Sequence, residues 1–260
     1  MEHQGRNIPL VSVVMPAYNA ERFIEEAVRS VMIQTFRDWE LIVLDDCSTD
    51  ATAAIVERLA QEDERITLVR NSENMGVALT RNRGFDLCRG EYAALLDSDD
   101  VWFPEKLEKQ VKLARETGAE ILYCSYGIMD EEGRQSCDDF IVPEETDFES
   151  FLTRSVISCS TAMLSKKIIE VHRFDITYYH EDLELWYRLL REGRKARGLP
   201  EVLAKYRVME GTRASNKLRS ALFRWQIYRG AMGFSWFKSL RLLTCYAVLG
   251  FRKYKKHTGS

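Results

Sequence analysis

Short apolar runs alternate with helical segments through the first half of the chain. The apolar runs at 11–15, 40–44, 66–69, 92–96 and 120–126 predict buried strands, and apolar residues at helical spacing mark 20–33, 51–62, 76–88 and 104–117. Strands separated by helices of this length pair in parallel through right-handed crossovers. The sequence therefore predicts an α/β protein with a Rossmann-like, mostly parallel central sheet flanked by helices.

Polar clusters follow three of these expected strands. They occupy residues 16–19 (Pro-Ala-Tyr-Asn), 45–48 (Asp-Asp-Cys-Ser) and 97–100 (Asp-Ser-Asp-Asp). Ligands of parallel sheets bind beyond the carboxyl ends of the strands, so the topology brings the three clusters to one edge. We expect a single binding site there.

The acidic cluster has the composition of a cation site. A strand that ends in Asp97-Ser98-Asp99 places two carboxylates on the same side of the pleat. Mg²⁺ and Mn²⁺ prefer oxygen ligands, and substrate phosphates commonly complete the shell. The alternative is that Asp99 or Asp100 caps the helix expected near Pro104. Capping does not explain Asp97, which follows two leucines and would be costly to bury without a partner.

Two further acidic pairs each allow two interpretations. Asp45 and Asp46 follow a buried strand, where one of the two carboxylates could accept a hydrogen bond from a nucleotide base, but Ser48 and Asp50 nearby are good helix caps. Glu181 and Asp182 begin a helical pattern that continues to Gly193. Acids are favoured in a first helical turn, so these two residues also have a purely structural explanation.

Taken together, these segments resemble glycosyltransferase family 2, whose members have the GT-A fold. The resemblance is carried in order by VSVVMPAYNAERFIEEAVRSVMIQTFRDWELIVLDDCSTD, NMGVALTRNRGF, GEYAALLDSDDVWFPEKLEKQ and HEDLELWYRLLREG, and it covers residues 9–215. Among members, the chain is most similar to bacterial enzymes that assemble surface polysaccharides, of the teichuronic-acid and O-antigen type.

The resemblance implies roles for individual residues. The expected nucleotide-binding residues are Pro16, Tyr18, Asn19, Asp46, Arg81 and Asp97, with Asp46 at the uracil ring. The expected metal ligands are Asp97, Asp99 and Asp100, and the metal is Mn²⁺ or Mg²⁺. Asp182 matches the general base that deprotonates the acceptor hydroxyl, and the family inverts the anomeric configuration. Such a transfer needs a base on one side and charge neutralisation on the other.

One motif departs from the family pattern. Many members have Tyr-Arg-x-His after the last strand, whereas this chain has Tyr206-Arg207-Val208-Met209. Methionine is a poor ligand for a hard cation, so water and phosphate would complete the metal shell, or Arg207 or Arg213 (a residue that the structure does not describe) would support the diphosphate.

Three further residues are expected contacts to the acceptor or the sugar. They are Trp102, His180 and Glu181. For Trp102 the alternative is ordinary packing, because large aromatic side chains dominate protein cores.

Charge is divided unevenly along the chain. Of 37 Lys and Arg, 11 follow Glu210, which is the last of the 40 acidic residues; residues 1–210 thus have 26 basic residues and a net charge of −14. Apolar and aromatic residues at 234–251 are interrupted by Lys238 and Arg241, which favours an interfacial helix over a membrane-spanning one. The alternative is a helix packed on the acidic body.

These patterns define the expected organisation. A flexible N-terminus at 1–8 precedes a catalytic domain at 9–215, of which 9–126 bind the nucleotide sugar and 127–215 the acceptor. Basic amphipathic helices at 216–260 would contact an anionic membrane surface. Residues 1–8 lack the apolar core of a signal peptide, and the six cysteines form no CxxC pair. We therefore expect a cytoplasmic protein, peripheral at the inner face of the cytoplasmic membrane.

The implied function is an inverting, metal-dependent transfer of a sugar from a UDP-sugar, of glucose or galactose type, to a polyprenyl-diphosphate-linked saccharide. Two alternatives stay open: a sugar-nucleotide-binding homologue without activity, and a transferase with a soluble or lipid A–core acceptor. No GxGxxG or Gly-rich basic loop follows the first strand, which disfavours oxidoreductases and nucleotidyltransferases. The acidic body disfavours nucleic acid as a partner.

Overall fold

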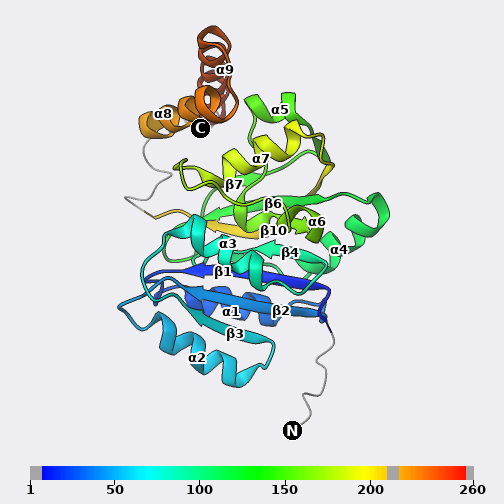
Figure 1. The fold of residues 1–260 in the computed structure, drawn as a ribbon, viewed down its shortest axis with the longest axis vertical. Coiled ribbons are helices and arrows are strands. Elements are labelled where there is room, and N and C mark those ends of the chain that lie inside the picture. Colours follow the sequence, from blue (N-terminus) through cyan, green and yellow to red (C-terminus); the bar gives the residue numbers. More distant parts are fainter. Residues whose placement is uncertain (1–7, 210–216, 256–260) are drawn as a thin grey trace.

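A computed structural model describes residues 8–209 and 217–255 (Figure 1). The first half contains β1 (Val11–Ala17), α1 (Ile24–Met32), β2 (Trp39–Asp45), α2 (Thr52–Glu62), β3 (Ile66–Arg70), α3 (Val77–Leu87), β4 (Tyr92–Leu95), β5 (Val101–Trp102) and α4 (Lys106–Thr117). The second half contains β6 (Ile121–Met129), β7 (Gln135–Phe140), β8 (Glu145–Thr146), α5 (Phe148–Thr153), η1 (Cys159–Thr161), β9 (Met163–Ser165), α6 (Lys166–Ile169), α7 (Glu181–Arg191), β10 (Ala196–Arg207), α8 (Lys217–Gln226), η2 (Ile227–Ala231) and α9 (Trp236–Lys255).

The described strands form one mixed sheet whose main path is β3-β2-β1-β4-β9-β6-β10-β5. β1 pairs in parallel with both β2 and β4, and β2 pairs in parallel with β3. β6 and β10 form a second parallel pair. The predicted mostly parallel sheet flanked by helices is therefore confirmed (Figure 1).

The sequence did not predict the short strand β9. It lies between β4 and β6 and is antiparallel to both, so β4 and β6 are not direct neighbours. With three residues, β9 is too short for period-2 alternation to be visible. β10 begins at Ala196 and not at 202, with irregular register between Leu199 and Ala204, where Pro200 interrupts the expected pattern.

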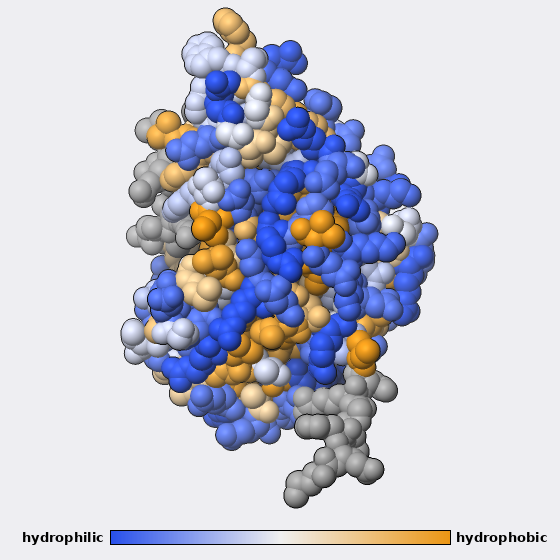
Figure 2. Space-filling view, in the orientation of Figure 1, coloured by the Kyte–Doolittle hydropathy of each residue, from blue (hydrophilic) through white to orange (hydrophobic). Residues whose placement is uncertain are grey.

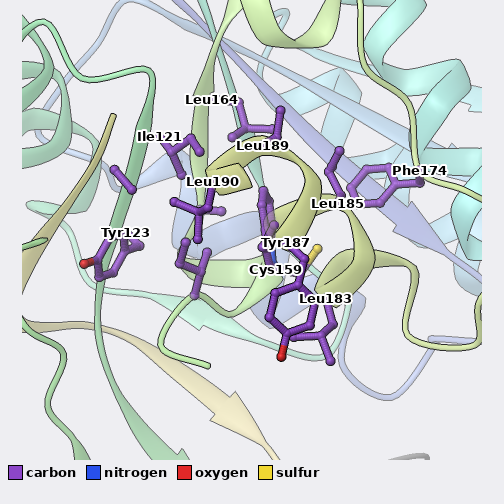
Figure 3. Close-up of a cluster of buried hydrophobic side chains, with 14 of the residues drawn as sticks. Ile121, Tyr123, Cys159, Leu164, Phe174, Leu183, Leu185, Tyr187, Leu189 and Leu190 are labelled. Carbon is purple, nitrogen blue, oxygen red and sulfur yellow. The ribbon is translucent and has the colours of Figure 1, made fainter. Parts of the chain in front are cut away.

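Helix α7 is held by a buried apolar face. Leu185, Trp186 and Leu189 are each 0% exposed. Figure 3 shows Leu185 beside Phe174 and Leu189 beside Leu164, which links α7 to β9 and to the segment before the helix. Burial of such side chains contributes ~1.5–3 kcal/mol each. The position of the α7 N-terminus is thus set by the core.

The C-terminal helices α8, η2 and α9, here called the tail, partly join that core. Ile227 and Tyr228 are 0% exposed, and the Tyr228 hydroxyl donates a hydrogen bond of 2.7 Å to the Leu152 carbonyl. α9 projects from the end of the molecule opposite α2 (Figure 1). Among the described residues, no helix combines the length and apolarity needed to cross a membrane. The expected flexible residues 1–7 and basic Lys256 lie outside the described residues.

Arg207 joins three parts of the fold at the end of β10. Its side chain is 2% exposed. Nε donates to the Asp99 carbonyl at 2.8 Å, and Nη1 donates to the carbonyls of Asp130 at 3.2 Å and Glu131 at 2.9 Å. Nη2 pairs with the Glu26 carboxylate at 2.6 Å. One guanidinium thus fixes the turn after β4, the β6–β7 hairpin and α1.

We predict that Arg207→Met destabilises the protein by ~2–4 kcal/mol, because several buried carbonyl groups lose their donor. The control is Arg197→Met on the same strand, since Arg197 is 42% exposed and pairs with Glu145 at the surface. Chemical unfolding of both variants provides the measurement. Equal stabilities for the two variants would contradict the role of Arg207.

Candidate functional site

The carboxyl ends of β1, β2 and β4 border a cavity of about 650 Å³. The three polar clusters meet there, together with the start of α7. The cavity is lined by Pro16, Ala17, Tyr18, Asp46, Val77, Thr80, Arg81, Asp97, Ser98, Asp99, Tyr126, Ile157, Ser158, Cys159, Tyr179, His180, Glu181, Asp182 and Tyr206. The three strand ends that were expected to share one site therefore meet at this cavity.

Asp97 and Asp99 lie on the turn that follows β4. The Asp97 backbone N–H donates to the Ser160 hydroxyl at 3.1 Å, which ties the turn to η1. Burial, and then the neighbouring Asp97 charge, raise the pKa of Asp99 to about 6. Crowding of carboxylates in a partly buried turn creates excess negative charge that a bound cation would relieve.

Asp100 points away from the cavity. It is 0% exposed, and its Oδ1 accepts a hydrogen bond of 2.8 Å from the Arg207 backbone N–H. Burial, followed by the charges of Asp99 and Asp97, raises the pKa of Asp100 well above its usual value. The expectation that Asp100 binds the metal and Arg207 contacts the ligand is not supported, because neither residue lines the cavity.

The capping alternative for these acids is also not observed. α4 begins at Lys106, and its N-cap is Glu105, which forms no side-chain capping bond. The acids after β4 therefore do not serve the helix that follows them.

Arg81 connects the two sides of the cavity from within α3. Nη2 donates to Asp97 at 2.5 Å and Nη1 to Glu181 at 2.7 Å. Burial alone would lower the pKa of Arg81, but the Asp97 and Glu181 carboxylates raise it well above its usual value. Gly84 allows α3 to pack closely on β1, because a Cβ at this position would lie 2.3 Å from Cγ1 of Val14.

Asp182 lies in the first turn of α7, on the side of the cavity opposite β4. His180 is the N-cap residue and forms no side-chain capping bond. Burial raises the pKa of Asp182, and the Arg81 charge partly opposes the rise. A carboxylate with a raised pKa is a stronger base, so the environment suits proton acceptance.

Asp46 organises the loop before α3. Its Oδ1 accepts from Asn71 at 2.6 Å and from the Met75 N–H at 2.9 Å, and its Oδ2 accepts from the Gly76 N–H at 2.8 Å. Asp46 also lines the cavity. Three acceptor positions are thus occupied by the protein, which leaves one on Oδ2 for a ligand.

Two expected contact residues lie outside the cavity. Asn19 has a φ of 48°, and its Oδ1 accepts from the Thr49 N–H at 2.9 Å, so it joins two loops at the cavity edge. Trp102 is 1% exposed, and its indole N–H donates to the Ser160 carbonyl at 2.7 Å. Packing is the observed state of Trp102, which cannot stack on a sugar from this position.

Five residues that line the cavity were not expected from the sequence to belong to the site. They are Ile157, Ser158, Cys159, Tyr126 and Tyr206. The segment 157–159 has no motif of its own. The tyrosines occupy β6 and β10, so their proximity depends on a strand pair whose members are 80 residues apart.

The carboxylates of the cavity could hold a cation together with a bound phosphate group. No group of three His, Cys, Asp or Glu side chains in the described ranges is arranged to hold a metal alone. Asp97 and Asp99 both face the cavity, and Mg²⁺ or Mn²⁺ commonly binds one or two carboxylates together with substrate phosphates. The residues present therefore fit a cation held jointly with a diphosphate.

Known proteins are similar to this chain in sequence. A family model described as "Glycosyl transferase family 2" matches residues 12–173. "Putative teichuronic acid biosynthesis glycosyltransferase TuaG" of Bacillus subtilis (strain 168) is 38% identical over 222 residues, covering 85% of this chain and 88% of TuaG. "UDP-Glc:alpha-D-GlcNAc-diphosphoundecaprenol beta-1,3-glucosyltransferase WfgD" of Escherichia coli is 31% identical over 246 residues, covering 94% of this chain and 95% of WfgD.

Solved structures share the fold. S. aureus TarS 1-349 in complex with UDP has a TM-score of 0.70 at 20% identity, covering 91% of this chain and 70% of TarS. The mannosyltransferase PcManGT from Pyrobaculum calidifontis, in complex with GDP-Man and Mn²⁺, has a TM-score of 0.71 at 22% identity, covering 93% of this chain and 70% of that protein. The chain therefore belongs to glycosyltransferase family 2 and has the GT-A fold.

Proposed function

We propose that this protein is an inverting glycosyltransferase that transfers a sugar from a UDP-sugar to a polyprenyl-diphosphate-linked saccharide. The observation that carries the proposal is the shared cavity. Two carboxylates, Asp97 and Asp99, line the cavity just after β4. The carboxylate of Asp182, whose pKa is raised, lines it at the start of α7.

On the donor side, the cavity suits a nucleoside diphosphate. Pro16 and Tyr18 provide an apolar and aromatic edge for a base, with the remaining acceptor position of Asp46 nearby. Asp97 and Asp99 would hold Mn²⁺ or Mg²⁺ together with the diphosphate. When bound, the cation supplies charge neutralisation for the departing nucleoside diphosphate.

On the acceptor side, Asp182 would take the proton of the attacking hydroxyl. The acceptor oxygen forms a bond to the anomeric carbon as the bond to the diphosphate oxygen breaks, and the proton passes to the Asp182 carboxylate. Attack from the side opposite the leaving group inverts the configuration, and no covalent enzyme intermediate is needed. A positioned base typically contributes about 10²–10⁴-fold to the rate.

Relatives support the substrate classes. The names of TuaG and WfgD refer to teichuronic acid and to a diphosphoundecaprenol-linked GlcNAc acceptor with a UDP-Glc donor, and TarS was solved with UDP. By similarity, we propose a role in bacterial surface-polysaccharide synthesis, with a glucose- or galactose-type donor. A binding protein without transfer activity is disfavoured because Asp97, Asp99 and Asp182 all line the cavity.

We expect wild-type protein to transfer sugar from one member of a UDP-sugar panel to a synthetic lipid-diphosphate GlcNAc, in the presence of Mn²⁺ or Mg²⁺. Asp182→Asn should reduce kcat by about 100-fold or more while donor affinity stays unchanged, because only the base is lost. Activity of the wild type should fall with decreasing pH, and the fall should begin above the usual aspartate range, because protonation inactivates a base whose pKa is raised.

Asp86→Asn provides the control for this experiment, since Asp86 is 62% exposed and lies outside the cavity. Product quantification by mass spectrometry gives the rates. Normal turnover by Asp182→Asn would exclude Asp182 as the base, and no transfer from any UDP-sugar would refute the proposed reaction.

Asp99→Asn should lower the metal-dependent affinity for UDP by at least about 100-fold, because even outer-shell partners of a metal contribute about 10–100-fold. Asp100→Asn is the matched control: its amide oxygen can still accept the Arg207 N–H, and burial already disfavours ionisation of that carboxyl. Calorimetry of UDP with and without Mn²⁺ measures both variants. Similar losses for the two variants would contradict the assignment of Asp99.

The tail has an outer face suited to an anionic membrane. Trp236, Phe237 and Leu240 are 53%, 80% and 41% exposed, and the basic residues Lys238 and Arg241 beside them are also exposed. In Figure 2, hydrophobic, pale and hydrophilic residues lie side by side over the top of the molecule, where Figure 1 places the tail. Because no acidic residue follows Glu210, an anionic lipid surface is the complementary partner.

Replacing both Trp236 and Phe237 by serine should lower partitioning onto vesicles that contain an anionic phospholipid by at least about tenfold, because each buried aromatic side chain contributes ~1.5–3 kcal/mol. Val171→Ser is the control, since Val171 is a 73% exposed apolar residue on the body. Vesicle flotation measures the bound fraction. A double variant that floats like the wild type would refute the membrane proposal.

A further inference from the structure

The segment before Asp182 has no regular backbone structure. Residues 171–180 form turns and bends between α6 and α7, without a strand or helix ladder. Tyr179 and His180 of this segment nevertheless line the cavity beside Asp182. The core fixes α7 itself, and side-chain contacts are needed in addition to hold Tyr179 and His180 in this wall of the cavity.

The tail contacts this wall directly. The Phe223 ring in α8 stacks on Tyr179 with ring centroids 4.0 Å apart and an interplanar angle of 14°. It also meets the His180 ring edge-on at 5.7 Å and 86°. At Gly230 in η2, an added Cβ would lie 2.8 Å from the Tyr178 hydroxyl, so the tail also packs closely there.

Phe223 is itself held in place by its neighbour. Arg224 is 5% exposed, and its Nη1 donates to the Tyr187 hydroxyl at 2.6 Å and to the Ser155 hydroxyl at 3.1 Å. α8 is thereby attached to α7 and to the segment after α5. Leu222, on the other side of Phe223, is 64% exposed and provides a natural comparison on the same helix.

We infer that Phe223 is a positioning residue for the acceptor: it fixes the Tyr179–His180 wall of the cavity beside Asp182. The inference rests on the proposed function in one respect, namely that the acceptor occupies the Asp182 side. Phe223 does not itself line the cavity, so it acts through Tyr179 and His180. The donor side, formed by residues of β1, β2 and β4, should be independent of it.

The test compares Phe223→Ala, Phe223→Tyr and Leu222→Ala in transfer to lipid-diphosphate GlcNAc. We expect Phe223→Ala to raise the KM for the acceptor about tenfold. Without the stacked Phe223 ring, Tyr179 and His180 can move away from the position in which they contact the acceptor. The KM for the donor and the calorimetric affinity for UDP should not change. Phe223→Tyr keeps the ring and should restore the acceptor KM, and Leu222→Ala should match the wild type.

Hydrogen exchange supplies a second readout that needs no activity. Backbone amides of residues 178–183 should exchange faster in Phe223→Ala than in Leu222→Ala, with the exchange of β1 and β2 unchanged. An unchanged acceptor KM in an active Phe223→Ala protein, or unchanged exchange at 178–183, would overturn the inference. If the wild type transfers no sugar at all, the proposed reaction fails, and the exchange comparison still decides the role of Phe223.

Discussion

The cavity depends on the ion pairs that the buried Arg81 guanidinium forms with two carboxylates. The guanidinium lies between Asp97 and Glu181, which come from opposite sides of the site and are 84 positions apart in the sequence. Without this cation, two largely buried carboxylates would face each other without compensation, at a cost of several kcal/mol. Gly84 lets α3, the helix that contains Arg81, pack closely on β1.

The sequence predicted the features that depend on local pattern. Alternating strands and helices predicted the parallel sheet, and the order of the strands predicted that Tyr18, Asp46 and Asp97 would meet at one cavity. These predictions succeed because a strand end fixes where a residue lies even when its partners are unknown. The sequence pattern shows where a strand ends. The direction of a side chain in the turn after the strand depends on contacts with distant residues.

The features that the sequence could not predict depend on contacts between distant residues. Asp99 and Asp100 are adjacent and chemically identical, yet Asp100 turns away because Arg207, 107 positions later, offers it a backbone N–H. Trp102 is buried in the core, where its indole N–H donates to the Ser160 carbonyl. β9 is inserted between β4 and β6 from a segment without visible periodicity. None of these partners is marked by a local pattern.

The tail has a buried face and an exposed apolar face. Arg224 and Tyr228 bury one face of it in the core, whereas Trp236 and Phe237 remain exposed on α9. The buried hydrogen bonds attach the tail to the body, and the exposed aromatic residues are the basis of the proposed membrane contact. Because Phe223 in the same tail stacks on the cavity wall, the element proposed to meet the membrane also shapes the acceptor side. For a lipid-linked acceptor, that arrangement places recognition of the surface and of the saccharide on one continuous structure.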